Sequence, residues 1–267
     1  MKQTHAKLMS SENCSSSAWV VGVAVCGIAA WYAIVWLFGL PKLLLPKPHQ
    51  VAQAAWQRRS ELFLGTCLTT TASLLGLLIA VALGSLIAVA FSLSKKIRLA
   101  FFPYVIFLQT VPIVAIAPLL IIWSGNRFRT VVMVTVIICL FPIVNNVTAG
   151  LLAIDKELAD LFRLYGAGKA KTLFRLQIPG AVRSLLVGTK TSSGLAVIGA
   201  IVAEFFISTG QSFSGLGALM QTWQGFNKTD ALIAALFASM VVGLLLFGTV
   251  RLTANTLLSR WVSTQSE

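Results

Sequence analysis

Long apolar runs separated by short polar connections dominate the chain. Five of these runs carry no charged residue, and they cover 18–40, 62–94, 99–126, 130–154 and 231–250. A sixth run, 184–207, is interrupted only by Lys190 and Glu204. An α-helix needs about 20 residues to cross the hydrocarbon core of a bilayer, and lipid offers no water to satisfy open backbone groups. The pattern therefore predicts an all-α, polytopic transmembrane helical bundle with about six spans.

The composition supports a membrane protein without a separate soluble domain. Of 267 residues, 57% are hydrophobic and 11% are charged, whereas about a quarter of the residues are charged in an ordinary soluble domain. We expect three parts: 1–61, with an N-terminal tail, the first span and an external connection; 62–260, the main transmembrane domain; and 261–267, a cytoplasmic tail.

The net charge of +13 has two interpretations, binding to nucleic acid and membrane topology. In a polytopic membrane protein, Lys and Arg mark the cytoplasmic side, so we expect no nucleic-acid partner. An N-terminus in the cytoplasm places more of these residues inside than outside, which predicts that both termini are cytoplasmic. Arg58 and Arg59 would then lie outside, and we expect them on an amphipathic external helix from about Gln50 to Glu61.

Three connections between the spans are longer than the others, namely 41–61, 155–183 and 208–230. The first is external in this topology and begins with prolines, which predict an extended turn. The third is also external, and its apolar core from Leu216 to Trp223 predicts a re-entrant or interfacial helix that is too short to span. The second is cytoplasmic and basic.

Prolines interrupt two of the predicted spans. Pro112 and Pro118 lie in the third span, and Pro142 lies in the fourth beside Asn145 and Asn146. A proline frees a backbone carbonyl, and broken helices at membrane depth occur where protein or a water-filled cavity receives the freed group. These two spans are therefore candidates for lining a path through the membrane. Kinks that only shape the packing of the bundle are the alternative.

Glu204 is a carboxylate near the outer end of the run 184–207. A charge inside the membrane is costly and indicates a functional site by default. A structural residue at the membrane interface is the alternative. Lys190 would lie about 21 Å away along a helix, so the two side chains cannot pair, and Lys190 is expected to extend toward the cytoplasmic surface.

The stretch YGAGKAKTLFRLQIP, residues 165–179, superficially matches a phosphate-binding loop. A P-loop needs a glycine, four further residues, and then Gly-Lys followed by Ser or Thr. Here Ala170 follows Lys169, and Arg163 stands where the first glycine would be. We therefore expect that this chain binds no nucleotide.

The same stretch predicts a helix, a tight turn and a second helix. Residues 157–166 are charged and compatible with a helix, and Gly166 and Gly168 permit a sharp break. The helix can resume from Lys169 to Gln177, and Pro179 is expected to end it. Such a cytoplasmic element exposes a compact surface to a partner. A solvated basic loop that only fixes topology is the alternative.

This stretch resembles the EAA motif of binding-protein-dependent ABC importer permeases. The residues that match the motif's spacing are Gly166, Ala167, Phe174, Leu176, Ile178 and Pro179. Asp160 keeps the acidic start of the motif, whereas Leu161 and Phe162 replace its two alanines. The flanking stretches VPIVAIAPLLIIWSG, FPIVNNVTAGLLAID, and IVAEFF followed by GLG resemble the nitrate, sulfonate and taurine branch of that family. The resemblance covers about 62–260.

The resemblance implies a multi-pass permease of a bacterial inner membrane with a cytoplasmic coupling helix. Its partners would be membrane lipid, a second permease copy, two cytoplasmic ABC ATPase subunits, and a periplasmic or lipid-anchored solute-binding protein. ATP and Mg would be bound by the ATPase, so this chain would hold no cofactor and would not be an enzyme. The solute would be small, such as nitrate, a sulfonate, taurine or a small heterocycle.

The resemblance also implies roles for particular residues. Coupling to the ATPase would involve Asp160, Tyr165, Gly166, Ala167, Gly168, Lys169, Phe174, Ile178 and Pro179. The translocation path or gate would involve Pro112, Pro118, Asn145, Asn146, Glu204, Gly215, Leu216 and Gly217.

Two other classes of membrane protein need residues that can be sought in this sequence. An ion-coupled secondary carrier would more often show charged relays at bilayer depth and inverted halves, and it remains the alternative function. An intramembrane serine protease needs a base beside its serine, but His5 and His49 both lie outside the predicted spans. No H-E-x-x-H motif is present either, so we expect no catalytic or metal-binding residue.

Overall fold

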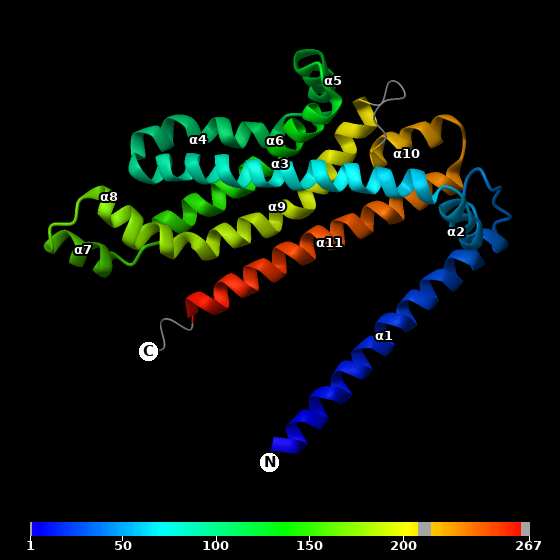
Figure 1. Cartoon of the computed structure of the whole chain (residues 1–267), viewed down its shortest axis with the longest axis horizontal. Coiled ribbons are helices and arrows are strands. Elements are labelled where there is room, and N and C mark those ends of the chain that lie inside the picture. The colour runs from blue at the N-terminus through cyan, green and yellow to red at the C-terminus, as the bar shows by residue number, and fades with distance from the viewer. Residues whose placement is uncertain (1, 208–214, 263–267) are drawn as a thin grey trace. The chain divides into compact units, whose positions relative to one another are not determined.

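The computed structural model describes residues 2–207 and 215–262, and these ranges contain helices but no strand. The elements are α1 (Lys2–Leu37), α2 (Pro48–Gln57), α3 (Arg59–Leu93), α4 (Lys95–Thr110), α5 (Ile113–Ser124), α6 (Arg127–Leu152), α7 (Lys156–Leu164), α8 (Lys169–Thr172), the π-helical turn η1 (Leu173–Gln177), α9 (Ile178–Ile207), α10 (Leu216–Gly225) and α11 (Thr229–Val262) (Figure 1). The all-α expectation is confirmed.

The chain divides into two compact units. One combines Met1–Arg59 with Trp223–Ala234, and the other combines Ser60–Thr222 with Ala235–Glu267. The helices that are long and apolar enough to cross a membrane lie mainly in the larger unit. In the described residues these are four single helices and the bent pair α4–α5, which makes up to five spans. The expected number of about six is therefore approximate.

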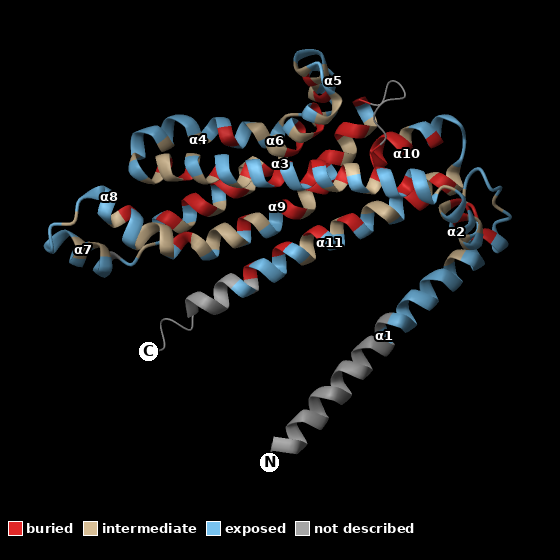
Figure 2. Ribbon diagram, viewed as in Figure 1, coloured by how far each residue is buried: buried red, intermediate tan, exposed pale blue. Residues whose placement is uncertain are grey.

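The core of the larger unit is built on close approach of α3, α6 and α9. Gly76 and Gly84 of α3 lie against Thr135 and Ile143 of α6, where an added Cβ would come within 2.5 Å and 2.7 Å of their side chains. Small residues let membrane helices approach closely in this way. Buried residues gather along α6 and α9 (Figure 2), so these helices form the frame that positions the candidate sites.

The third predicted span is not one straight helix. α4 and α5 meet at an angle of 100°, and α5 turns away from α4 in Figure 1. Val111 and Pro112 both have extended backbone angles. A proline disfavours the helical conformation of the residue before it, which accounts for Val111. Pro118, by contrast, lies inside α5 and does not end it.

Pro179 does not end the helix after the basic stretch, contrary to the prediction. It is the second residue of α9, and α8, η1 and α9 form one apolar helix from Lys169 to Ile207. Pro179 therefore lies inside a continuous helix, where a proline removes one backbone hydrogen bond. The π-helical turn directly before it loosens the regular ladder at the place where the proline lacks a donor.

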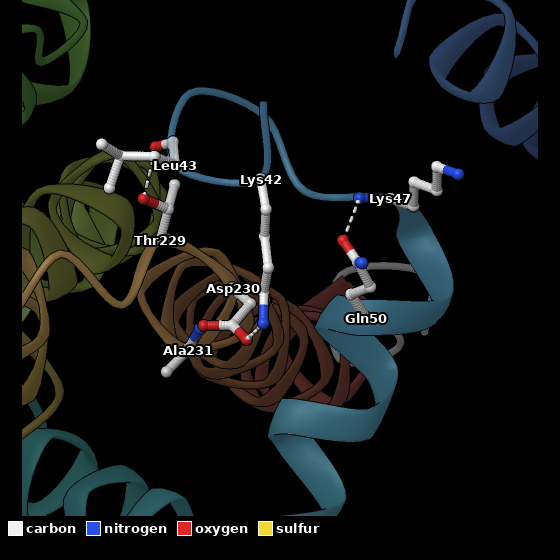
Figure 3. Close-up of polar contacts among 7 residues, drawn as sticks. All are labelled: Lys42, Leu43, Lys47, Gln50, Thr229, Asp230 and Ala231. Atoms are coloured by element: carbon white, nitrogen blue, oxygen red, sulfur yellow. Dashed lines mark hydrogen bonds and ion pairs between the residues drawn. The ribbon is translucent and has the colours of Figure 1, made fainter. Parts of the chain in front are cut away.

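The connection 41–61 begins with a turn, as predicted, but its helix is shorter than expected. α2 ends at Gln57 and Arg58 caps it, so the pair Arg58 and Arg59 lies at the junction with α3 and not on an amphipathic helix that reaches Glu61. At the other end, the backbone N–H of Lys47 donates to Oε1 of Gln50 at 3.0 Å (Figure 3).

The connection before α2 is tied to the start of α11. Nζ of Lys42 forms an ion pair with a carboxylate oxygen of Asp230 at 3.0 Å, and the hydroxyl of Thr229 donates to the carbonyl of Leu43 at 2.7 Å (Figure 3). We call these two contacts the clasp. Both connections were predicted to be external, and the clasp joins segments that are 186 residues apart in sequence.

Candidate functional site

The stretch 155–179 folds as the predicted helix, tight turn and helix. Asp155 caps α7, since its carboxylate accepts a hydrogen bond from the N–H of Glu157 at 3.0 Å. Gly166 follows the helix with φ of +65°, a left-handed conformation that favours glycine. This part of the prediction is confirmed.

Two backbone donors of this turn are held by the end of α7. The N–H of Gly166 donates to the carbonyl of Arg163, and the N–H of Ala167 donates to the carbonyl of Phe162, both at 2.9 Å. These two bonds form a Schellman motif, which satisfies the last carbonyls of a helix. The two bonds fix the conformation of the turn between α7 and α8.

An apolar surface is exposed around the turn. The side chains of Leu164 and Tyr165 are 84% and 82% exposed, and Phe174 is 68% exposed. α7 and the start of α8 are exposed over most of their length in Figure 2. We call the group formed by Leu164, Tyr165 and Phe174 the coupling surface.

The remaining predicted coupling residues lie in the same segment of the chain. Asp160 forms an exposed ion pair with Arg163 at 3.4 Å, and Ile178 is half-buried at the start of α9. Ala167 and Lys169 line a cavity of about 240 Å³ with Arg163 and the end of α3. Gly168 precedes α8 and has ordinary extended angles. All nine predicted coupling residues lie within 160–179, and their role in coupling stays a prediction.

A second group of predicted residues meets at the far end of α9. Glu204 is 1% exposed, and its carboxylate accepts hydrogen bonds from the hydroxyl of Thr69 at 2.9 and 3.0 Å and from the N–H of Gly217 at 2.9 Å. The N–H of Leu216 donates to the same hydroxyl oxygen at 2.9 Å. The cluster joins α3, α9 and the first turn of α10.

The chemistry of this cluster is that of a helix cap. The first N–H groups of a helix have no partner within the helix, and the positive end of its dipole favours a carboxylate. Glu204 and Thr69 supply both the acceptors and the charge to α10. The arrangement therefore fixes the start of a short helix against two long ones.

Glycine is required beside this cap. A Cβ at Gly215 would meet the carboxylate of Glu204, and a Cβ at Gly217 would meet the carbonyl oxygen of Ile201 and lie 2.8 Å from Cβ of Glu204. The predicted group of Glu204, Gly215, Leu216 and Gly217 is thus brought together. Thr69 was not among the predicted site residues. The only indication in the sequence was that a buried carboxylate such as Glu204 needs a hydrogen-bond donor.

The other predicted path residues lie in two places. α5, which contains Pro118, packs its Ala117 and Leu120 in a core with Ala200 and Ala203 of α9, beside Glu204. Asn146 and Asn145 lie elsewhere, on α6. Nδ2 of Asn146 donates to the carbonyl of Pro142 at 2.7 Å, whereas Asn145 is exposed and lines a cavity between α4 and α6.

Comparison with known proteins finds transport proteins that match most of this chain. The family model for the binding-protein-dependent transport system inner membrane component matches residues 80–264. A formylaminopyrimidine transport permease of Halalkalibacterium halodurans is 29% identical over 85% of this chain and 90% of its own. A putative aliphatic sulfonates transport permease of Bacillus subtilis is 28% identical, over 88% of this chain and 84% of its own.

A solved structure agrees at the level of the fold. The crystal structure of an amino acid ABC transporter with histidines aligns with a TM-score of 0.62, covering 76% of this chain and 97% of the other, at 19% identity.

Proposed function

The chain belongs to the family of binding-protein-dependent transport system inner membrane components, and from that premise we propose how it works as the permease of an ABC importer. Two copies form the membrane channel, and each docks one cytoplasmic ATPase subunit through its coupling surface. A solute-binding protein delivers the solute from outside. ATP and Mg are bound by the ATPase subunits, and this chain carries no catalytic residue.

The observation that carries this proposal is the exposed coupling surface. A soluble or lipid-facing turn does not need Leu164, Tyr165 and Phe174 exposed on a segment that also carries Arg163 and Lys169. Apolar side chains rimmed by charged ones are typical of protein interfaces. The Schellman turn holds the surface in one conformation, so movement of the ATPase is transmitted to α9 through the continuous helix that begins at Lys169.

The proposed orientation places both termini in the cytoplasm. The basic segment between α6 and α9 then lies inside, as the positive-inside rule favours, and the clasp of Lys42 and Asp230 lies outside. α10 is proposed as an external gate element whose start is held by Glu204 and Thr69. Pro112, Pro118, Asn145, Asn146, Gly215, Leu216 and Gly217 are proposed to line or shape the path.

The solute is proposed to be a small anion such as nitrate, a sulfonate or taurine, or a small heterocycle. Both classes have support among the relatives, one of which is named for formylaminopyrimidine and another for aliphatic sulfonates. In this proposal, the binding protein determines most of the selectivity for the solute.

The test compares Leu164→Asp with Leu164→Met in copurification with the ATPase. A charge on the coupling surface is expected to release most of the ATPase, because a desolvated carboxylate without a partner is costly at an interface. Methionine keeps the apolar contact and should retain it. Equal recovery of ATPase with both variants would contradict docking at this surface.

A further inference from the structure

A cavity of about 420 Å³ lies beside the clasp in the smaller unit. Three segments of that unit form its walls, namely the connection before α2, the last turn of α2 and the turn that leads into α11. Its charged lining residues are Lys42, Arg58, Lys228 and Asp230. Three cations and one carboxylate therefore line the same hollow.

The carboxylate of this cavity is already paired. One oxygen of Asp230 lies 3.0 Å from Nζ of Lys42 (Figure 3), and its other oxygen accepts a hydrogen bond from the N–H of Ala231 at 2.9 Å. The charges of Asp230 and Lys42 balance each other within the clasp. Any net charge of the cavity therefore comes from its other cations.

Aromatic rings hold two of these cations in place. Cζ of Arg58 lies 5.4 Å from the ring centre of Trp223, and Nζ of Lys228 lies 5.5 Å from the ring centre of Phe226. An aromatic ring attracts a cation through its quadrupole, but it carries no net charge that would neutralise one. Lys228 is exposed and forms no ion pair within the described part of the chain. Its charge is therefore positioned for a partner outside the chain.

Basic residues are in excess in the two segments that form the cavity. The residues 41–59 and 223–234 contain one acidic residue, Asp230, and the basic residues Lys42, Lys47, Arg58, Arg59 and Lys228. In the proposed orientation these residues lie outside, whereas the positive-inside rule favours Lys and Arg in the cytoplasm. Membrane topology therefore does not account for them, and an acidic partner does.

Large aromatic side chains are exposed beside these basic residues in the sequence. Trp56 is 72% exposed and Phe226 is 69% exposed, and Cζ of Arg59 lies 5.1 Å from the ring centre of Trp56. Aromatic residues and Arg are enriched at protein interfaces and among the residues that dominate binding. The negative surface potential that attracts basic segments to a membrane belongs to the cytoplasmic leaflet. A protein partner thus fits an external basic segment better than a lipid headgroup.

We propose that the cavity beside the clasp docks an acidic surface of the solute-binding protein. A carboxylate of that protein enters the cavity and pairs with Nζ of Lys228, beside Arg58, while Phe226 packs against the partner. The inference rests on the proposed function, because it requires the external location of the cavity and the delivery of solute by a binding protein.

The experiment uses the purified complex of permease and ATPase in nanodiscs, together with the solute-binding protein encoded with this permease. Association and dissociation rates are measured by biolayer interferometry at low and at high ionic strength. The variants are Lys228→Glu and Lys228→Arg. Lys47→Glu is the matched control, because it makes the same charge change at an exposed lysine of the same unit that does not line the cavity. Phosphatidylglycerol that copurifies in detergent is measured by mass spectrometry.

Lys228→Glu is expected to associate with the binding protein at least about tenfold more slowly than wild type at low ionic strength, because electrostatic steering contributes about 10–10³-fold to such rates. It should also dissociate faster, since a like charge then faces the acidic group. Salt should reduce the difference in association. Lys228→Arg should behave like wild type, and Lys47→Glu should keep the wild-type dissociation rate. The unfolding midpoint of Lys228→Glu should equal that of wild type, because the lysine forms no ion pair within the chain.

Equal rates for wild type and Lys228→Glu, or equal losses in Lys228→Glu and Lys47→Glu, would overturn docking at this cavity. So would phosphatidylglycerol that copurifies with wild type and is lost in Lys228→Glu while the binding protein still binds, because the occupant would then be a lipid headgroup. ATP hydrolysis stimulated by the binding protein is measured in parallel. Stimulation that survives in Lys228→Glu with unchanged binding removes this inference alone, whereas a wild-type complex that no binding protein stimulates removes the proposed function.

Discussion

The hydroxyl of Thr69 lies 2.9 Å from one carboxylate oxygen of Glu204 and 3.0 Å from the other, although the two residues are 135 positions apart. This contact joins α3 to α9, and the same hydroxyl accepts the N–H of Leu216. One threonine therefore holds two long helices and the start of α10 together.

Loss of this hydroxyl should destabilise the protein. Thr69→Val keeps the shape of the side chain but leaves the N–H of Leu216 without an acceptor and the buried carboxylate of Glu204 with only the N–H of Gly217. Loss of such a buried partner typically costs about 1–3 kcal/mol. Thr69→Ser keeps the donor and the acceptor and serves as the control. Thermal unfolding in detergent should show a clearly lower midpoint for the valine variant, and equal midpoints would mean that the contact contributes little.

The glycines beside Glu204 should not tolerate a methyl group. Gly217→Ala places a Cβ against the carbonyl of Ile201, and because this neighbour is backbone, it cannot move aside cheaply. Gly194→Ala in α9 is the control, since nothing lies within 4 Å of its added Cβ and alanine favours a helix by up to about 1 kcal/mol over glycine. The amount of folded protein extracted from the membrane should fall for the first variant only. A normal yield of Gly217→Ala would contradict the tight contact.

The turn at Gly166 should couple the ATPase to transport. Gly166→Val must adopt a positive φ that a β-branched side chain resists, so the coupling surface is displaced while the spans are untouched. We expect normal insertion into the membrane but loss of stimulated ATP hydrolysis and uptake. Gly168→Ala, at a φ of −68° with open space around it, should remain active. An active valine variant would show that the turn conformation is not needed.

Topology can be checked by labelling single cysteines in a background without native cysteines. Cysteine at Leu164 should react with an impermeant reagent only from the cytoplasm, and cysteine at Phe226 only from outside. Both side chains are exposed, so neither result depends on burial. The reversed pattern would contradict both the orientation and the docking of an ATPase at the coupling surface.

The features that could be predicted from the sequence are those set by local patterns. Apolar runs located α3, α6, α9 and α11, and the spacing of Gly166 and Gly168 located the turn. The break at Pro112 was harder to predict from the sequence, because Pro103, Pro118 and Pro142 lie inside helices without ending them. Composition alone does not tell which proline is placed where packing favours a sharp bend.

The features that could not be predicted depend on contacts between distant segments. Glu204 was identified as an unusual buried charge, but Thr69 is one of several threonines in α3, and only the packing of α3 on α9 selects it. Pro179 was expected to end a helix because a proline usually does so inside one. The π-helical turn at Leu173–Gln177 changes that outcome, and no local pattern announced it.

Uptake into proteoliposomes tests the central claim most directly. The purified chain is reconstituted with or without its ATPase, and solute uptake is measured with the binding protein present, with and without ATP, and under an imposed ion gradient. An ABC importer permease is predicted to give uptake only with the ATPase and ATP together, regardless of the gradient. Uptake by the chain alone, driven by the ion gradient, would contradict the account and identify a secondary carrier.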